Sequence, residues 1–136
     1  MKTLTIEWKH LDRDGNTCDR CGDTGRTLRK TVRTMRRRCR PCGVAIKLIE
    51  TRLPARRLKE SNMILFNGVP LETALGDAMV RKNDCGSCST LVGQAAQCRA
   101  VQRRGKTFEA IPDKLIQEAA CRVANCDCPL DAARHR

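Results

Sequence analysis

The sequence predicts an α/β protein with a partly parallel sheet, followed by a smaller cysteine-rich region. Strand-like and helix-like patterns alternate from Leu4 to Val80, and an Asn67-Gly68 pair lies between two apolar runs. Glycine, serine and cysteine then gather after Asn83. Strands that alternate with helices are joined by crossover connections, so we expect a mixed sheet flanked by helices, with a small cysteine-containing C-terminal extension.

The first strand and the first helix have clear periods. Residues 4–11 alternate between apolar and polar side chains, which predicts a strand with one buried face. From Thr24 onward the apolar positions recur at steps of four, three and four, as in an amphipathic helix. These positions are Leu28, Val32, Met35 and Cys39. Pro41 and Gly43 are expected to end the helix.

The rest of the predicted sheet follows directly. Residues 44–51 have the pattern of a better-buried strand, and Pro54 starts a short helix. Asn67-Gly68 is a strong hairpin signal, and it predicts antiparallel strands at Met63–Phe66 and Val69–Leu71. A short helix or helical turn is expected over residues 73–80.

The C-terminal part changes character. A glycine- and serine-rich loop precedes a hairpin that turns at Arg104-Gly105, and a helix begins at Pro112. We therefore expect a core in residues 1–82, a cysteine-rich extension with hairpin and helix in residues 83–128, and a mobile tail in residues 129–136.

The chain is strongly basic, with a formal net charge of +12. Eight arginine and lysine residues lie between Arg26 and Arg40, so this helix face can attract the phosphates of a nucleic acid. Tyrosine is absent, and the aromatic residues are only Trp8, Phe66 and Phe108, which disfavours stacking on single strands. A basic nucleic-acid-binding module with structural zinc is therefore a third hypothesis for the function. It ranks below two hypotheses that rest on the cysteines.

The compartment decides how the ten cysteines are interpreted. The chain has no apolar run long enough to span a membrane and no apolar stretch typical of a secretory signal near its start, so we expect a cytoplasmic protein away from membranes. In a reducing compartment, many cysteines indicate metal binding or redox chemistry rather than a disulfide framework.

The first cysteine pair, Cys18 and Cys21, lies between the first strand and the long helix. This order of elements resembles the thioredoxin fold, in which a Cys-x-x-Cys loop opens a helix. A thiolate at a helix N-terminus is stabilised by unpaired N–H groups, so Cys18 is expected to be the nucleophile and Cys21 the resolving thiol. The position at which such proteins place a cis-proline reads Ser61-Asn62-Met63 here.

A second Cys-x-x-Cys pair, Cys39 and Cys42, follows at the far end of the predicted helix, at a spacing typical of four-cysteine zinc sites. A helix rises about 1.5 Å per residue, so a helical segment of this length would separate the pairs by about 25 Å. Four sulfurs around one zinc ion each lie about 2.3 Å from the metal. We therefore predict that the two pairs do not form one site, and that Cys39 is a core residue.

The better metal candidates are Cys85, Cys88 and Cys98. A Cys-x-x-Cys pair with a third cysteine in a flexible loop can wrap around an ion, and Cys121, Cys126 or Cys128 could supply a fourth thiolate. Such sites suit zinc, an iron–sulfur cluster or a soft metal ion. A second redox pair and thiols without a metal are the alternatives.

Several motifs resemble an uncharacterised prokaryotic cysteine-rich family with a thioredoxin-like fold, a domain of unknown function. They read W-K-H-L, T-C-x-R-C-x-x-T-G, E-T-R-L-P, E-S-N-x-I-L-x-N-G-x-P-L-E, D-C-G-S-C and F-E-A-I-P, and start at Trp8, Thr17, Glu50, Glu60, Asp84 and Phe108. The resemblance covers roughly residues 3–124. It implies the fold but no activity, and Cys39, Cys42, Cys126 and Cys128 lie outside its motifs.

Two functions lead. The first is a small thiol protein in thiol–disulfide exchange or soft-metal handling, with a thiol redox partner or a metal donor protein. The second is a non-catalytic zinc- or soft-metal-binding protein linked to metal resistance. Whether the protein is an enzyme stays open at this point.

Overall fold

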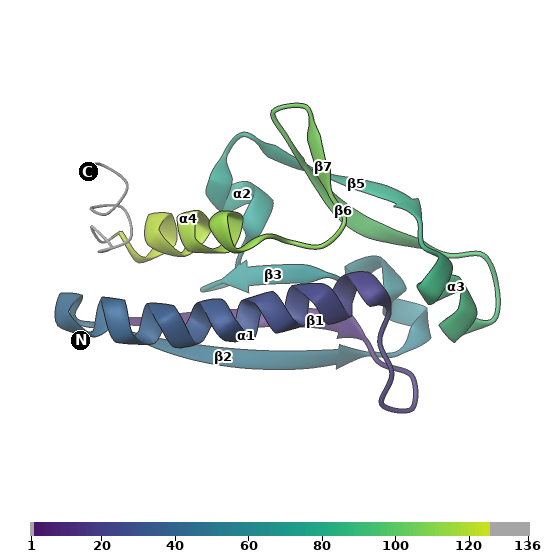
Figure 1. The fold of residues 1–136 in the computed structure, drawn as a ribbon, viewed down its shortest axis with the longest axis horizontal. Helices are drawn as coiled ribbons and strands as arrows, with labels where there is room; N and C mark the ends of the chain where they lie inside the picture. The colour runs from purple at the N-terminus through teal and green to yellow at the C-terminus, as the bar shows by residue number, and fades with distance from the viewer. Residues whose placement is uncertain (1, 126–136) are drawn as a thin grey trace.

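The computed structural model describes residues 2–125, which form seven strands, four α-helices and two 3-10 helices (Figure 1). In chain order they are β1 (Lys2–Leu11), α1 (Asp19–Cys39), η1 (Arg40–Cys42), β2 (Val44–Leu53), η2 (Ala55–Glu60), β3 (Met63–Phe66), β4 (Val69–Pro70), α2 (Leu71–Leu75), β5 (Ala78–Asp84), α3 (Gly86–Val92), β6 (Gln97–Arg103), β7 (Lys106–Phe108) and α4 (Asp113–Ala124).

The first sheet is mixed and has the strand order β2-β1-β3-β4. Strand β1 pairs in parallel with β2, with Leu4 opposite Ile46, and antiparallel with β3, with Trp8 opposite Ile64. The β3–β4 hairpin turns at Asn67 and Gly68, both of which have positive φ. The parallel pair requires a crossover, which α1 provides.

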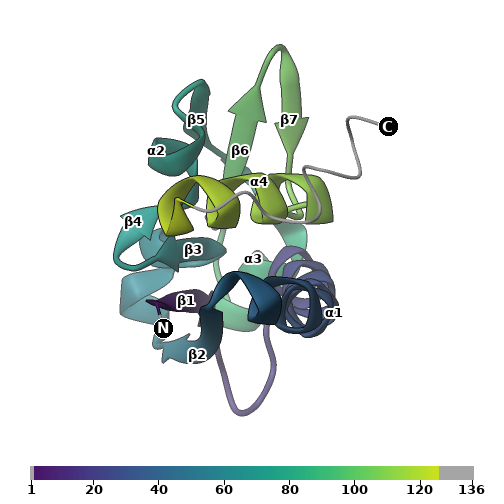
Figure 2. The same cartoon turned by 90° about the vertical axis from the view of Figure 1, so that its left-hand side faces the viewer.

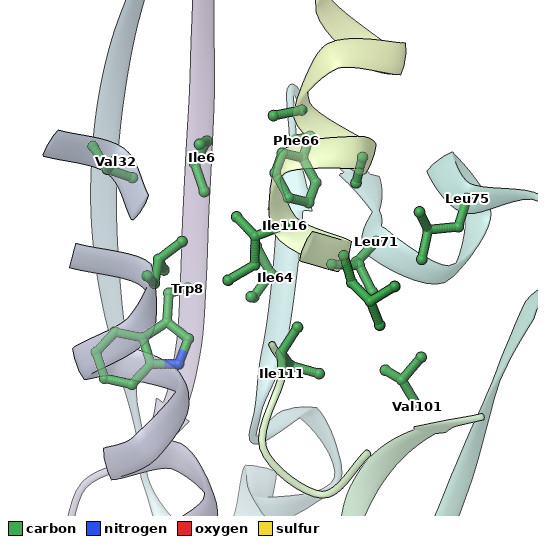
Figure 3. Packing of buried hydrophobic residues seen from close by; sticks show 14 of the residues in the cluster. Ile6, Trp8, Val32, Ile64, Phe66, Leu71, Leu75, Val101, Ile111 and Ile116 are labelled. Atoms are coloured by element: carbon green, nitrogen blue, oxygen red, sulfur yellow. The ribbon is translucent and has the colours of Figure 1, made fainter. Parts of the chain in front are cut away.

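Helices α1 and α4 lie side by side on one face of this sheet (Figure 2). The apolar stripe of α1 is buried, as its period predicted, and packs with residues of β1, β3 and α4 in one hydrophobic cluster (Figure 3). Gly25 permits the close approach of α1 to β1, because a Cβ at this position would lie 2.8 Å from Cζ2 of Trp8.

The second sheet is antiparallel, with the order β5-β6-β7. Helix α3 connects β5 to β6 and lies near the start of α1 (Figure 1). Asn62, at the entry to β3, joins the two sheets because its side-chain amide donates to the carbonyls of Arg99 and Glu109, at 3.3 and 2.7 Å.

The structure confirms most predicted elements and corrects three. Helix α1 begins at Asp19 rather than Thr24, because the polar first turn, which contains Cys21, is already helical. Residues 78–84 form strand β5, since Gly76 adopts a positive φ and ends α2. Part of the expected serine-rich loop is helix α3, which Cys85 begins and Gly93 ends.

The chain is thus a mixed α/β protein, as predicted. The division at residue 82 stays a prediction, and the tail at 129–136 lies outside the described residues. Among residues 2–125, no helix has the length and the apolar character needed to cross a membrane.

Candidate metal centre

The first cysteine pair occupies the start of α1. Cys18 is the N-cap residue, with extended backbone angles, and its carbonyl accepts the first helical hydrogen bond from the N–H of Gly22 at 2.8 Å. Cys21 lies within the first turn, and both side chains are 0% exposed. The pair is therefore at the predicted position, but bulk water does not reach it.

The other predicted cysteines come from the second sheet and its helix. Cys85 is the N-cap residue of α3, and its sulfur accepts a hydrogen bond from the N–H of Cys88 at 3.4 Å. Cys98 lies on β6, opposite Asn83 of β5. The Sγ atoms of Cys88 and Cys98 are 2.7 Å apart, and all three side chains are buried.

The structure brings these two groups together. The Sγ atoms of Cys18, Cys85, Cys88 and Cys98 all lie within 4.8 Å of one another. Four sulfurs placed tetrahedrally at about 2.3 Å from one ion stand about 3.8 Å apart, so Cys88 and Cys98 would separate by about 1 Å on binding it, and no other pair starts more than 4.8 Å apart. Four buried cysteines are thus positioned to hold a metal ion. We refer to these four residues as the thiol cluster.

The fourth member differs from the residues that the sequence suggested. The cluster contains Cys18 in place of Cys121, which lies on α4. Cys126 and Cys128, the other two candidates, lie outside the described residues. Spacing gave no signal for Cys18, because it lies far from Cys85 along the chain and only tertiary contacts of the start of α1 with β5 and α3 join them.

Arg20 holds the two halves of the site together. Its guanidinium is 8% exposed and binds the side chain of Asn83, the carbonyl of Asp84 at 2.5 Å and the carboxylate of Glu109 at 3.0 Å. Because Asp84 directly precedes Cys85, these bonds fix the end of β5 over the start of α1. From the sequence, Arg20 is expected only to favour the neighbouring thiolate by its charge, and its bonds to the end of β5 are not predicted.

A second hydrogen bond between the two halves of the site involves Asp19, the residue before Arg20. The backbone N–H of Asp19 donates to the hydroxyl of Ser87 at 2.9 Å, so α3 supplies a cap to the first turn of α1. The capping bond therefore depends on the same approach of the two helices that assembles the thiol cluster.

Cys21 lies beside the cluster but outside the group of four. Its sulfur is 3.0 Å from the hydroxyl of Ser61, which also accepts a hydrogen bond from the N–H of Leu11 at 3.1 Å. Ser61 belongs to the segment before β3 at which thioredoxin-like proteins place a cis-proline. A hydroxyl thus holds the second thiol of the pair in position.

The sulfurs are electrostatically unequal. Hydrogen bonds from Cys21, Cys88 and Cys98 lower the pKa of Cys18, against the effect of burial. The pKa of Cys21 is raised, first by its hydrogen bond to Cys18 and then by burial. Hydrogen bonds to Cys18 are also the largest cause of the raised pKa values of Cys88 and Cys98. The lowered pKa of Cys18 and the raised pKa values of its three neighbours thus share one cause, the hydrogen bonds among these sulfurs.

The second Cys-x-x-Cys pair lies at the other end of α1. Cys39 is the last residue of the helix and is buried, whereas Cys42 ends η1 and is exposed. Neither belongs to the thiol cluster. The prediction that the two pairs do not share one ion is therefore confirmed.

The basic residues of α1 after Arg20 face outward. Lys30, Arg33 and Arg37 are exposed and line a shallow cavity of about 490 Å³ together with Thr34 and Arg36. Nothing in the described residues tests whether this face binds a nucleic acid, so nucleic-acid binding stays a prediction.

Residues 4–120 match the model of a protein family described as Domain of unknown function (DUF2703). The chain therefore belongs to this family, and the matched range includes the whole thiol cluster. An uncharacterised protein of Archaeoglobus fulgidus is 32% identical over 117 residues, which cover 83% of this chain and 82% of that protein. No solved structure matches the chain.

Proposed function

We propose that the protein binds one soft or borderline metal ion, with zinc as the first candidate, through Cys18, Cys85, Cys88 and Cys98. The observation that carries this proposal is the approach of four buried sulfur atoms to within 4.8 Å of one another. Sites of four thiolates suit zinc and related soft ions, and their ligands form a closed shell.

A single ion fits this arrangement better than an iron–sulfur cluster. In a cluster the cysteines bind different iron atoms, so their sulfurs stand farther apart than four ligands of one ion. All pairwise separations in the thiol cluster are short enough for one centre. Sulfurs this close repel one another when they lose their protons, and a bound cation compensates that repulsion.

The frame that we propose is thioredoxin-like. Its support is the strand order β2-β1-β3-β4, with β1 and β2 parallel and β3 antiparallel, together with a Cys-x-x-Cys pair between β1 and α1. On this frame, residues 1–82 form the core and the segment after it supplies three of the four ligands. The segment from β5 to β6 then acts as a cover over the dithiol.

Thiol–disulfide exchange is the second candidate. It is favoured by the lowered pKa of Cys18, for which the hydrogen bond from Cys21 is the largest cause, and by its N-cap position. It is disfavoured by burial, because a nucleophilic thiol must be accessible to a disulfide of another protein, and both cysteines are 0% exposed. We therefore place soft-metal handling first, in the cytoplasm, with a metal donor or a thiol protein as partner.

The test is the metal content of the purified chain. The protein is purified without oxygen, added metal or a histidine tag, and its metal is measured by mass spectrometry. We expect about one ion per chain. The Cys85→Ser/Cys88→Ser double variant removes two ligands and should be free of metal.

The matched control is the single Cys42→Ser variant, which changes an exposed cysteine outside the thiol cluster and should keep the ion. Circular dichroism of each variant confirms that the fold persists. A chain that takes up no zinc, cadmium or mercury from buffered solutions, but reduces the disulfides of insulin, would replace metal binding with the second candidate.

A further inference from the structure

Cys18 belongs to two groups of sulfur atoms at once. It is one of the four sulfurs of the thiol cluster, and it is also the N-cap half of a Cys-x-x-Cys pair whose second thiol, Cys21, lies in the first turn of the same helix. A Cys-x-x-Cys pair at a helix start is the arrangement in which one thiol can close a disulfide with the other. One sulfur atom cannot be a thiolate ligand and part of a disulfide at the same time.

We propose that the protein releases its metal when Cys18 and Cys21 are oxidised to a disulfide, so that Cys21 is the reserve thiol of a redox-controlled metal site. This inference rests on the proposed metal-binding function and names its regulation. Oxidation removes one of four ligands and leaves Cys85, Cys88 and Cys98, an incomplete shell that holds zinc less tightly.

The reaction balances with a disulfide, R–S–S–R, as the oxidant. The thiol of Cys21 loses its proton and attacks R–S–S–R, which forms a mixed disulfide and expels one thiol, RSH. The sulfur of Cys18 then leaves the ion and attacks the sulfur of Cys21, and the second RS⁻ departs. The pair is oxidised by two electrons, and R–S–S–R is reduced to RSH and RS⁻.

The surroundings of Cys21 fit this role. Cys21 lies in the first turn of α1 beside Cys18 but is not one of the four ligands, so a filled site leaves its sulfur without a bond to the metal. Ser61 holds its sulfur from one side, at 3.0 Å. Thr17 and Gly22, which flank the pair, line a cavity of about 830 Å³. Because Cys21 itself is 0% exposed, a small disulfide in this cavity reaches its sulfur only when the start of α1 opens locally.

A competing disulfide is present in the same cluster. Cys88 and Cys98 are 2.7 Å apart and could also be oxidised. Both are ligands, so their oxidation must break two metal–sulfur bonds, whereas closure of Cys18 with Cys21 breaks only one. The two routes differ in their dependence on Cys21, which makes the proposal testable.

The experiment uses the full chain loaded with zinc, in zinc buffers and in mixtures of glutathione and glutathione disulfide of graded ratio. Retained zinc is measured after desalting, and alkylation followed by mass spectrometry maps the disulfides. The wild type and the Cys21→Ser and Cys21→Ala variants are compared after equilibration, so that slow opening of the buried site does not limit the result. Zinc bound before oxidation shows that each variant is folded.

We expect the wild type to lose zinc as the Cys18–Cys21 disulfide forms. Its midpoint potential should become more positive by about 30 mV for each tenfold rise in free zinc, because zinc binds the reduced form. Both Cys21 variants should keep their zinc at ratios that empty the wild type.

Two results overturn the inference alone. One is release from the Cys21 variants at the same potential as from the wild type, with Cys88 joined to Cys98. The other is a wild type that keeps its zinc with Cys18 and Cys21 oxidised. A wild type that never binds zinc instead overturns the proposed function, together with the inference that depends on it.

Discussion

Two of the three Cys-x-x-Cys pairs of this chain lie at opposite ends of the same helix, yet their surroundings are different. Cys18 and Cys21 lie at the start of α1, where β5, α3 and β6 cover them with three further cysteines. Cys39 and Cys42 lie at its end, where the chain passes through η1 into β2.

The difference shows that spacing alone does not make a metal site. The first pair gains its partners through long-range packing, which Arg20 and Ser87 fix with hydrogen bonds to the end of β5 and the start of α1. At the second pair, Cys42 is exposed to solvent. A closed metal shell needs buried sulfurs that converge from different elements, and only the first pair provides this within the described residues.

The sharpest test of this comparison removes one sulfur at each end. Cys18→Ser takes away a ligand and should lower zinc affinity by more than about 100-fold, the upper end of what loss of an outer-shell partner costs. Cys42→Ser should leave the affinity unchanged. Competition with a chromogenic chelator measures both. Equal losses in the two variants would show that the second pair contributes ligands.

The pH dependence separates the sulfurs within the cluster. The raised pKa values of Cys88 and Cys98, caused chiefly by their hydrogen bonds to Cys18, keep both thiols protonated below those values. Zinc must displace these protons, so affinity should rise by about tenfold per pH unit for each proton displaced, and by at least about 100-fold per pH unit when both are displaced. Calorimetry in buffers of different ionisation enthalpy counts the protons. Affinity that does not change between pH 6 and 8 would contradict this.

Arg20 should matter because it positions ligands without being one. Arg20→Met removes the bonds to Asn83, Asp84 and Glu109, and should lower zinc affinity by about 10- to 100-fold. Arg20→Lys keeps the charge but not the planar guanidinium, so its zinc affinity should lie between those of the wild type and Arg20→Met. Arg38→Met, an exposed arginine near the other end of α1, is the matched control. If both methionine variants weaken zinc equally, net charge rather than position is responsible.

The smallest effect concerns the packing of α1 near the first pair. Gly25→Ala places a Cβ 2.8 Å from Cζ2 of Trp8, and such overpacking lowers the free energy of unfolding by about 1–3 kcal/mol. At Gly22 the nearest atom to a Cβ is Nη1 of Arg26, at 3.6 Å, so Gly22→Ala should stabilise the helix by about 0.5–1 kcal/mol. Urea denaturation of the metal-free chain measures both. A Gly25→Ala variant as stable as Gly22→Ala would show that α1 can move away from β1.

Local patterns determined much of this protein. Alternation in residues 4–11, the four-three-four stripe of α1, Asn67-Gly68 and Arg104-Gly105 each specify an element through the chain's own periods and turn chemistry, and the structure has all of them. The charged strand β5 escaped this reasoning, because its alternation is weak and its place in a sheet depends on β6.

The composition of the thiol cluster could not be predicted from local patterns. The sequence singled out Cys18 and Cys21 as one group and Cys85, Cys88 and Cys98 as another, because residues within one motif lie close along the chain. Only the tertiary structure decided that Cys18 joins the second group, since the buried guanidinium of Arg20 anchors the end of β5 to α1. Contacts between segments far apart in the chain depend on how the two sheets pack. The spacing of cysteines within either motif therefore does not predict how close the two groups lie in the folded protein.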